Sequence, residues 1–223
     1  MPHPDPIAGT RAVVLAAGAG SRFGGGKLCA DWHGRPLITA AVAAALATPV
    51  EAVHVVVGAD ASEVRQCLAG SGDPRLSFVL CPDWAEGISA SLRAGIDSLP
   101  RDTRAVIVFL GDMPMVSADL ATRLLEGVLS GAPAAIAVCE DRPAHPVAIG
   151  AAVFPRLRLL EGDQGARRLL EALPGVMRVP TTDTGSVADV DTVADLDALS
   201  DPAVRRARSS SSRDGPEAGP DKH

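Results

Sequence analysis

Apolar positions along the chain fall into short continuous runs that alternate with stretches of helical spacing. Predicted strands cover residues 11–17, 52–58, 76–80, 105–112, 134–139, 175–180 and 186–190. Predicted helices cover residues 36–47, 60–70, 88–99, 117–130, 165–173 and 192–200. Continuous runs of Val, Ile and Leu are typical of strands that are buried on both faces. The pattern therefore predicts an α/β fold, with a mostly parallel central sheet and helices on both faces.

The two ends of the chain differ from this pattern. Residues 1–10 hold three prolines, and residues 201–223 are polar, serine-rich and poor in large apolar side chains. We expect both segments to be disordered, which leaves one domain over residues 11–200. A chain of 223 residues is long enough for such a domain to bury a sizeable core.

Composition narrows the class of protein. The net charge of -6 argues against a broad nucleic-acid-binding surface, although a local basic pocket for a small anion stays open. The sequence contains no run of 18 apolar residues and no signal-peptide core, so neither a membrane span nor secretion is expected. The four cysteines lack metal-binding spacing, and we expect them to be reduced thiols in a cytoplasmic protein.

Parallel sheets bind ligands at the carboxyl ends of their strands, so the residues after each strand are the candidates for chemistry. After the first strand, residues 15–27 read LAAGAGSRFGGGK. Phe23 breaks the dinucleotide pattern and Leu28 breaks the P-loop pattern. Glycines still let backbone N–H groups approach an anion, and Arg22 and Lys27 add charged donors for phosphate. Five glycines and two cations here favour phosphate binding over the alternative, a mobile surface turn with solvated cations.

Acidic residues follow two other predicted strands. Asp112 ends the fourth strand, where a carboxylate is costly unless it is paired or binds a cation. Mg²⁺ is commonly held by one or two carboxylates together with substrate phosphates. Asp189 and Asp191 flank Val190, and a short strand would put both on one face. The alternatives are that Asp112 is a turn or cap residue and that Asp191 caps the last helix.

Three further segments hold weaker candidates. Gly87 and Ser91 open a helix whose N-terminus favours anions, although serine capping explains the same residues. His145 precedes a proline, and a lone histidine is more often a surface or core residue than a ligand contact. Arg167 and Arg168 lie in the first turns of a helix, where one is expected to be solvated and the other to meet a phosphate. A phosphate-binding loop with a magnesium carboxylate indicates nucleotide chemistry.

Seven stretches of the chain carry a family resemblance. In chain order they are LAAGAGSRFGGGK, GRPLI, CPDWAEGISASLRAGI, GDMP, HPVAIG, GDQGARRLL and DVDTVADL. Together they resemble the MobA-like nucleotidyltransferases, and most closely the MocA-like molybdenum cofactor cytidylyltransferases. The resemblance spans residues 11–199 and is more specific for the superfamily than for the substrate. Phe23, Cys81 and Val193 depart from the family pattern.

The resemblance implies a Rossmann-like nucleotidyltransferase fold and a Mg²⁺-dependent transfer of CMP from CTP to a molybdopterin-type phosphate, with release of pyrophosphate. It implies catalytic roles for Arg22, Lys27 and Asp112, and Mg²⁺ binding by Asp112 and Asp191. Candidate acceptor contacts are His145 and Arg167. The implied partner is a molybdoenzyme or its chaperone. Candidate nucleotide contacts are Leu15, Ala16, Ala17, Gly18, Gly20, Arg22, Lys27, Asp83, Gly87 and Ser91.

Specificity rests on one methyl group. Ala17 stands where the guanylyl-transferring branch has glycine, so the space beside the base is narrower and CTP is favoured over GTP. The alternative is that Ala17 merely packs and several nucleotides are accepted. Other functions also stay open: guanylyl or sugar-phosphate nucleotide transfer, an NAD(P)H-dependent oxidoreductase of the nicotine-blue reductase type, and a nucleotide-binding chaperone without catalysis. Asp112 and Asp191 favour catalysis over binding alone.

Overall fold

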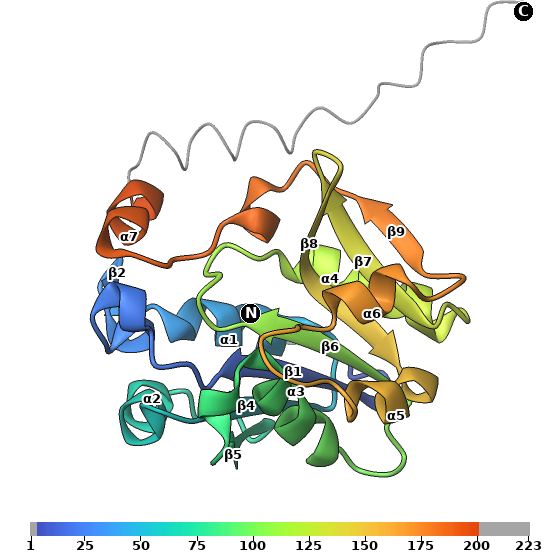
Figure 1. The fold of residues 1–223 in the computed structure, drawn as a ribbon, viewed down its shortest axis with the longest axis horizontal. Helices are drawn as coiled ribbons and strands as arrows, with labels where there is room; N and C mark the ends of the chain where they lie inside the picture. The colour runs from blue at the N-terminus through green and yellow to red at the C-terminus, as the bar shows by residue number, and fades with distance from the viewer. Residues whose placement is uncertain (1–3, 201–223) are drawn as a thin grey trace, which may run out of the picture.

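A computed structural model describes residues 4–200, which are organised around a seven-stranded sheet (Figure 1). Its strands are β1 (Thr10–Ala16), β4 (Ala52–Val57), β5 (Leu76–Leu80), β6 (Ala105–Leu110), β7 (Ala134–Cys139), β8 (Arg142–Gly150) and β9 (Met177–Pro180). The spatial order is β5-β4-β1-β6-β8-β7-β9. Within this sheet β8 runs antiparallel to β6 and β7, and the other pairs are parallel. The predicted mostly parallel sheet is confirmed.

Helices cover both faces of the sheet. They are α1 (Ile38–Ala47), α2 (Ala61–Leu68), α3 (Ile88–Asp97), α4 (Ala118–Leu129), α5 (Phe154–Leu157), α6 (Arg167–Glu171) and α7 (Val193–Ser200). α1, α2 and α4 share one apolar cluster, and α3, α5 and α6 share the cluster on the opposite face. Successive residues of β1 point to opposite faces, so Val14 joins the first cluster and Val13 the second.

Short elements complete the chain between the main strands and helices. A two-stranded ribbon pairs β2 (Asp31–Trp32) with β3 (Arg35–Pro36). The 3-10 turns are η1 (Ser21–Phe23), η2 (Lys27–Cys29), η3 (Trp84–Glu86), η4 (Ala151–Val153) and η5 (Thr184–Val187). Among the described residues, no helix has the length and apolar character needed to cross a membrane.

α7 packs against the N-terminal part of the chain, close to the glycine-rich loop. Leu196 and Leu199 of α7 pack in a third apolar cluster with Val190 and Leu37, and Phe23 of η1 packs against it. α7 accordingly lies beside the short strands that follow the glycine-rich loop (Figure 1). This packing carries the segment before α7, which holds the second acidic group, to the carboxyl edge of the sheet.

Three local predictions are wrong. β8 was not predicted, because Pro143, His145 and Pro146 interrupt its apolar residues. Residues 186–190, predicted as a strand, form the end of η5 and irregular backbone instead. Pro36 lies in β3 rather than in the first turn of a helix.

The folded part also begins earlier than expected. The Ile7 backbone N–H donates to the Pro49 carbonyl at 3.0 Å, and the Thr10 hydroxyl donates to the Ile7 carbonyl at 2.7 Å. Thr10 is already the first residue of β1 and is fully buried. Residues 7–10 therefore belong to the domain rather than to a disordered end. The expected disordered tail, residues 201–223, lies outside the described residues.

Candidate active site

A glycine-rich loop follows β1 and presents two cations to the edge of the sheet. Two 3-10 turns shape it, and each begins after a glycine in the left-handed region, Gly20 with φ 58° and Gly26 with φ 63°. A side chain would be strained at either position, so the loop depends on glycine there. Arg22 lies in the first turn, and Lys27 begins the second. Gly18 is exposed, and a Cβ added to it would meet no atom within 4 Å, which leaves its backbone open to a ligand.

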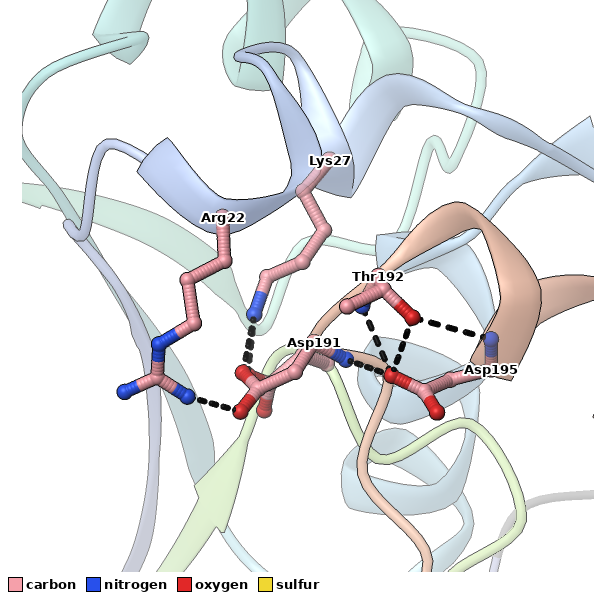
Figure 2. Close-up of polar contacts among 6 residues, drawn as sticks. Arg22, Lys27, Asp191, Thr192 and Asp195 are labelled. Carbon is pink, nitrogen blue, oxygen red and sulfur yellow. Dashed lines mark hydrogen bonds and ion pairs between the residues drawn. The ribbon is translucent and has the colours of Figure 1, made fainter.

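Four charged side chains meet at this edge, and we call Arg22, Lys27, Asp112 and Asp191 the charged cluster. Figure 2 labels three of them, Arg22, Lys27 and Asp191. The Lys27 ammonium donates to Asp112 Oδ2 at 2.7 Å and lies 3.6 Å from Asp191 Oδ1. Arg22 Nη1 pairs with Asp191 Oδ2. The Lys27 side chain is 12% exposed and the Arg22 side chain 75%, so Lys27 is held within the site while Arg22 lies on its solvent side.

Both carboxylates are placed by the backbone around them rather than by capping roles. The Val190 N–H donates to the Asp112 carbonyl at 3.0 Å, which ties the two acidic segments together. Thr192 and Asp195 cap α7 reciprocally: Asp195 Oδ2 accepts from the Thr192 N–H at 2.7 Å, and Thr192 Oγ1 accepts from the Asp195 N–H at 3.2 Å (Figure 2). The alternative that Asp191 caps this helix is therefore wrong.

Asp112 lies in the turn after β6, as the alternative expected, but it does not cap a helix. Ser117 caps α4, and its hydroxyl accepts from the Leu120 N–H at 3.4 Å. Asp112 lies beyond the end of β6 and directs its carboxylate to Lys27. Neither aspartate of the charged cluster is needed to begin a helix, so both carboxylates remain available for chemistry at the sheet edge.

A cavity of about 390 Å³ lies beside the charged cluster, on the sheet face covered by α3 and α6. Leu92, Val108 and Ile136 supply apolar wall. His145 of β8 and Asp189 supply polar groups next to it. The cavity can therefore surround an apolar or aromatic group while two polar side chains orient it.

The pKa values of the two polar groups in the cavity are shifted from their ordinary values. Burial lowers the pKa of His145 to about 4, against the opposing effect of the Asp112 charge. Its Nδ1 is buried and has no hydrogen-bond partner among the described residues. Desolvation, followed by the charges of Asp112 and Asp191, raises the pKa of the Asp189 carboxyl. At neutral pH His145 is thus an uncharged group that lacks a partner for one ring nitrogen.

The two aspartates of the D-V-D segment do not share a face. Asp191 turns to Arg22 and Lys27, whereas Asp189 lines the cavity. The prediction of a shared face is wrong because the segment is not a strand. In the sequence, the two-residue spacing from Asp191 is the signal that points to Asp189, and it does not reveal a role for this residue.

The predicted nucleotide contacts on β1 divide between the cavity and the core. Leu15 lines the cavity, whereas Ala16 and Ala17 are buried. The Ala17 carbonyl accepts from the Ala59 N–H at 3.0 Å. The Ala17 methyl faces Gly58, where an added Cβ would lie 2.8 Å from it. Ala17 therefore has a packing role whether or not its backbone also meets a base.

The predicted contacts that follow β5 are more dispersed. Asp83 is exposed at the start of η3. Gly87 has φ 112°, and a Cβ there would clash with Asp163 and Gly162. Ser91 is 5% exposed, and its hydroxyl hydrogen-bonds the Cys81 thiol, so it faces the interior rather than the charged cluster.

The predicted acceptor contacts both line the cavity, from different elements. His145 comes from β8 and Arg167 from the start of α6. Arg167 is exposed, and its Nε donates to Glu171 Oε1 at 2.9 Å. An anion at the rim of the cavity can therefore compete with Glu171 for this guanidinium.

The charged cluster fits a divalent cation through its carboxylates. Within residues 4–200 there is no group of three or more His, Cys, Asp or Glu side chains able to hold a metal. Asp112 and Asp191 nevertheless direct oxygens to one cation, the Lys27 ammonium. Mg²⁺ takes oxygen ligands, and phosphates and water commonly complete its shell. Two carboxylates next to a phosphate-binding loop match that requirement.

A glycine-rich, cationic loop opposite two carboxylates, with a cavity for a second substrate beside them, is typical of nucleotidyltransferases. The model of the MobA-like NTP transferase domain matches residues 12–176. The chain therefore belongs to this family of nucleotidyltransferases, as its sequence motifs predicted.

Known relatives extend over most of the chain. The purine catabolism protein PucB of Bacillus subtilis is 29% identical over 208 residues, which cover 88% of this chain and 96% of PucB. The 2-C-methyl-D-erythritol 4-phosphate cytidylyltransferase of Streptomyces avermitilis is 34% identical over 152 residues, which cover 66% of this chain and 58% of that enzyme.

A solved structure shares the fold. Rv0371c from Mycobacterium tuberculosis, in complex with manganese, superposes with a TM-score of 0.71 over 86% of this chain and 98% of that one. Sequence identity to it is 24%, so the likeness establishes the Rossmann-like nucleotidyltransferase architecture alone. Divalent metals thus occur in proteins of this fold.

Proposed function

We propose that the protein is a Mg²⁺-dependent cytidylyltransferase that transfers CMP from CTP to a molybdopterin-type phosphate and releases pyrophosphate. The charged cluster is the observation that carries this proposal. Two cations and two carboxylates, drawn from segments up to 169 residues apart, meet at the carboxyl edge of the sheet. The mutual ion pairs keep these four charges neutralised until a triphosphate and a metal replace them.

The cations would act on the triphosphate. Lys27 and Arg22 exchange their carboxylate partners for phosphate oxygens, and open backbone at Gly18 lets the loop approach the same group. An oxygen of the acceptor phosphate attacks the α-phosphorus. The bond from the α-phosphorus to the bridging oxygen of the β-phosphate breaks, and both electrons leave with pyrophosphate. Lys27 and Arg22 neutralise the charge that develops on this leaving group.

The carboxylates released by this exchange would hold the metal. Asp112 and Asp191 would be its protein ligands, and the Mg²⁺ would supply neutralisation of phosphate charge. Rv0371c, which shares this fold, was solved in complex with manganese, and this is consistent with the use of a divalent cation. Asp189 stands next to both ligands, and burial, followed by the charges of Asp112 and Asp191, raises the pKa of its carboxyl.

The cavity would receive the acceptor. Its apolar walls suit a flat ring system, and the neutral His145 has a free nitrogen with which to orient one. Arg167 at the rim supplies a cation for the acceptor phosphate. The family resemblance would make a molybdoenzyme, or its chaperone, the recipient of the product.

The choice of CTP rests on the tight surroundings of Ala17. The Ala17 methyl is buried and faces Gly58, where an added Cβ would lie 2.8 Å from the methyl and 2.7 Å from Trp84 Cβ. We infer that this close packing holds the loop where it leaves less room for a purine than for a pyrimidine. The cytidylyltransferase relative from Streptomyces avermitilis is consistent with a cytosine-containing substrate. We propose the same preference here, with Ala17 as its determinant.

A thermal-shift screen with Mg²⁺ tests the nucleotide assignment. CTP at about a hundredfold above its dissociation constant should add about 2.7 kcal/mol to the free energy of unfolding. GTP, UTP, ATP and NADPH at the same concentration should add less. Equal shifts with all four triphosphates would remove the preference for cytosine, and a shift with NADPH alone would favour the oxidoreductase function.

A further inference from the structure

The described residues contain one close pair of thiols outside the charged cluster and the cavity. Cys67 of α2 donates its thiol hydrogen to Cys29 Sγ at 2.7 Å, across 38 residues of sequence. Both residues are partly exposed. Cys81 and Cys139, by contrast, are buried in the core. Two sulfur atoms in contact near the surface satisfy the first requirement for forming a covalent bond with each other.

The pair joins two elements that differ in their role. Cys29 is the last residue of η2, the turn that begins with Lys27. Cys67 lies in the final turn of α2, a helix anchored in the core by Val64 and Leu68. A bond between the two sulfurs would tether the glycine-rich loop to a packed helix, two residues from the lysine that pairs with Asp112.

We propose that Cys29 and Cys67 form a reversible disulfide that fixes the glycine-rich loop against α2. The oxidant is a small-molecule disulfide. Cys67, as the thiolate, attacks one sulfur of that disulfide, which forms a mixed disulfide and releases one small thiolate. Cys29 then loses its proton to solvent and attacks Cys67 Sγ, which forms the Cys29–Cys67 bond and releases the second small thiol. The two protein thiols lose two electrons and two protons, and one small disulfide becomes two thiols.

The protonation of Cys29 sets this order of steps. Burial, followed by the neighbouring Cys67 thiol, raises the pKa of Cys29 to about 12. Cys29 therefore stays a thiol in the reduced protein and is a poor first nucleophile, which leaves the first attack to Cys67. When disulfides occur in a reducing compartment, they are usually transient or redox-sensing. A reversible bond at the loop is consistent with such a role, and it does not depend on the substrate proposed above.

Thiol counting with peptide mapping tests the proposal on the full chain. After treatment with oxidised glutathione, the number of free thiols in the unfolded protein should fall from four to two, and dithiothreitol should restore all four. Tryptic cleavage separates Cys29, in residues 28–65, from Cys67, in residues 66–75, so the bond appears as a linkage between these two peptides. Four remaining thiols, or linkage through Cys81 or Cys139, would overturn the proposal.

Variants sharpen the test. Cys67→Ser should show no linkage between two protein cysteines. Each of its three cysteines should be either a free thiol or a glutathione adduct that thiol exchange removes. The matched control, Cys139→Ser, should still lose two thiols. Amide exchange in residues 24–29 should slow when wild-type protein is oxidised. Unchanged exchange alongside the mapped bond would refute the claim that the disulfide fixes the loop. If a variant fails to fold, mapping of the wild-type protein alone decides the bond.

Discussion

The charged cluster and the cavity lie side by side at one edge of the sheet and handle polar groups in opposite ways. In the cluster, Arg22 and Lys27 each face a carboxylate, so every cation has an acidic partner within reach. In the cavity, His145 is kept neutral by burial and has no partner for Nδ1. The charged cluster holds paired charges that can exchange partners with a ligand. The cavity holds a buried histidine nitrogen that has no hydrogen-bond partner among the described residues.

The contrast between the charged cluster and the cavity explains how the nucleotide and the acceptor can bind at separate places. A triphosphate gains most where cations are available, while a ring system gains most where apolar walls surround one polar contact. Asp112 and Asp189 lie at the boundary, where burial, and then the charge of Asp112, raises the pKa of Asp189. Changes in the cluster should therefore affect catalysis, and changes in the cavity should affect acceptor binding and pH-dependent stability.

The largest effect is expected for Asp112→Asn. Loss of a metal ligand should cost several kcal/mol of transition-state stabilisation, or roughly a thousandfold or more in turnover. The melting temperature should change little, because the side chain lies beyond the end of β6 and outside the core. The matched control is Asp197→Asn, at an exposed aspartate of α7, which should leave turnover unchanged. Near wild-type turnover in Asp112→Asn would contradict the assignment.

The cavity predicts a different kind of change for His145→Asn. The folded-state pKa of His145 is about 4, below the ordinary value of 6.5, so the unfolded state binds more protons between these values. The stabilisation is complete above pH 6.5 and is lost as the pH falls toward 4. The loss should reach about 3 kcal/mol at most.

Urea unfolding at pH 7.5 and at pH 5 measures this effect. The wild-type protein should lose more stability between these two pH values than His145→Asn does. His33→Asn, at an exposed histidine in the turn between β2 and β3, is the control and should keep the wild-type slope. Parallel pH profiles for wild type and His145→Asn would show that His145 can take up its proton in the folded protein.

Lys27→Ala should weaken nucleotide binding and slow turnover together. One charge-assisted contact is worth about 1.5–3 kcal/mol, which corresponds to roughly 10- to 150-fold. Titration calorimetry with CTP and steady-state kinetics measure the two quantities. Arg35→Ala, at an exposed arginine of β3, provides the control. Unchanged affinity and rate would reduce the loop to a surface turn.

The smallest effect is expected for Ala17→Gly. Removing the methyl group should widen the space near Gly58 and Trp84, and the ratio of kcat/KM for CTP to that for GTP should fall by about tenfold. The rates with both nucleotides are measured under identical conditions. A constant ratio would show that Ala17 only packs, as its burial alone would suggest.

The half of the fold before Gly131 was largely predictable, because its buried parallel strands are continuous apolar runs. The half after it was less so. β8 was missed because its edge toward the cavity carries Pro143 and His145 rather than apolar residues. Residues 186–190 were assigned as a strand on alternation alone, yet Ala188 and Val190 pack in the cluster formed by α7 and Phe23 of the glycine-rich loop.

The residue types of the site were predictable, but their pairing was not. Arg22 and Lys27 were selected from the glycine-rich loop, and Asp112 and Asp191 from the ends of strands. The contact between Lys27 and Asp112 spans 85 residues, and only the folded chain reveals that the four charges neutralise one another. The neutral state of His145 likewise depends on burial by distant elements, which no local pattern encodes.

Pyrophosphate release tests the central claim most directly, namely that the charged cluster transfers a nucleotide. The protein is incubated with Mg²⁺, molybdenum cofactor as acceptor, and CTP, GTP, UTP or ATP in turn. We predict release that requires both CTP and the acceptor and is lost in Asp112→Asn. Preference for GTP would refute the base assignment and leave the mechanism standing. No release with any nucleotide, together with NAD(P)H consumption on a quinone-like dye, would contradict the account.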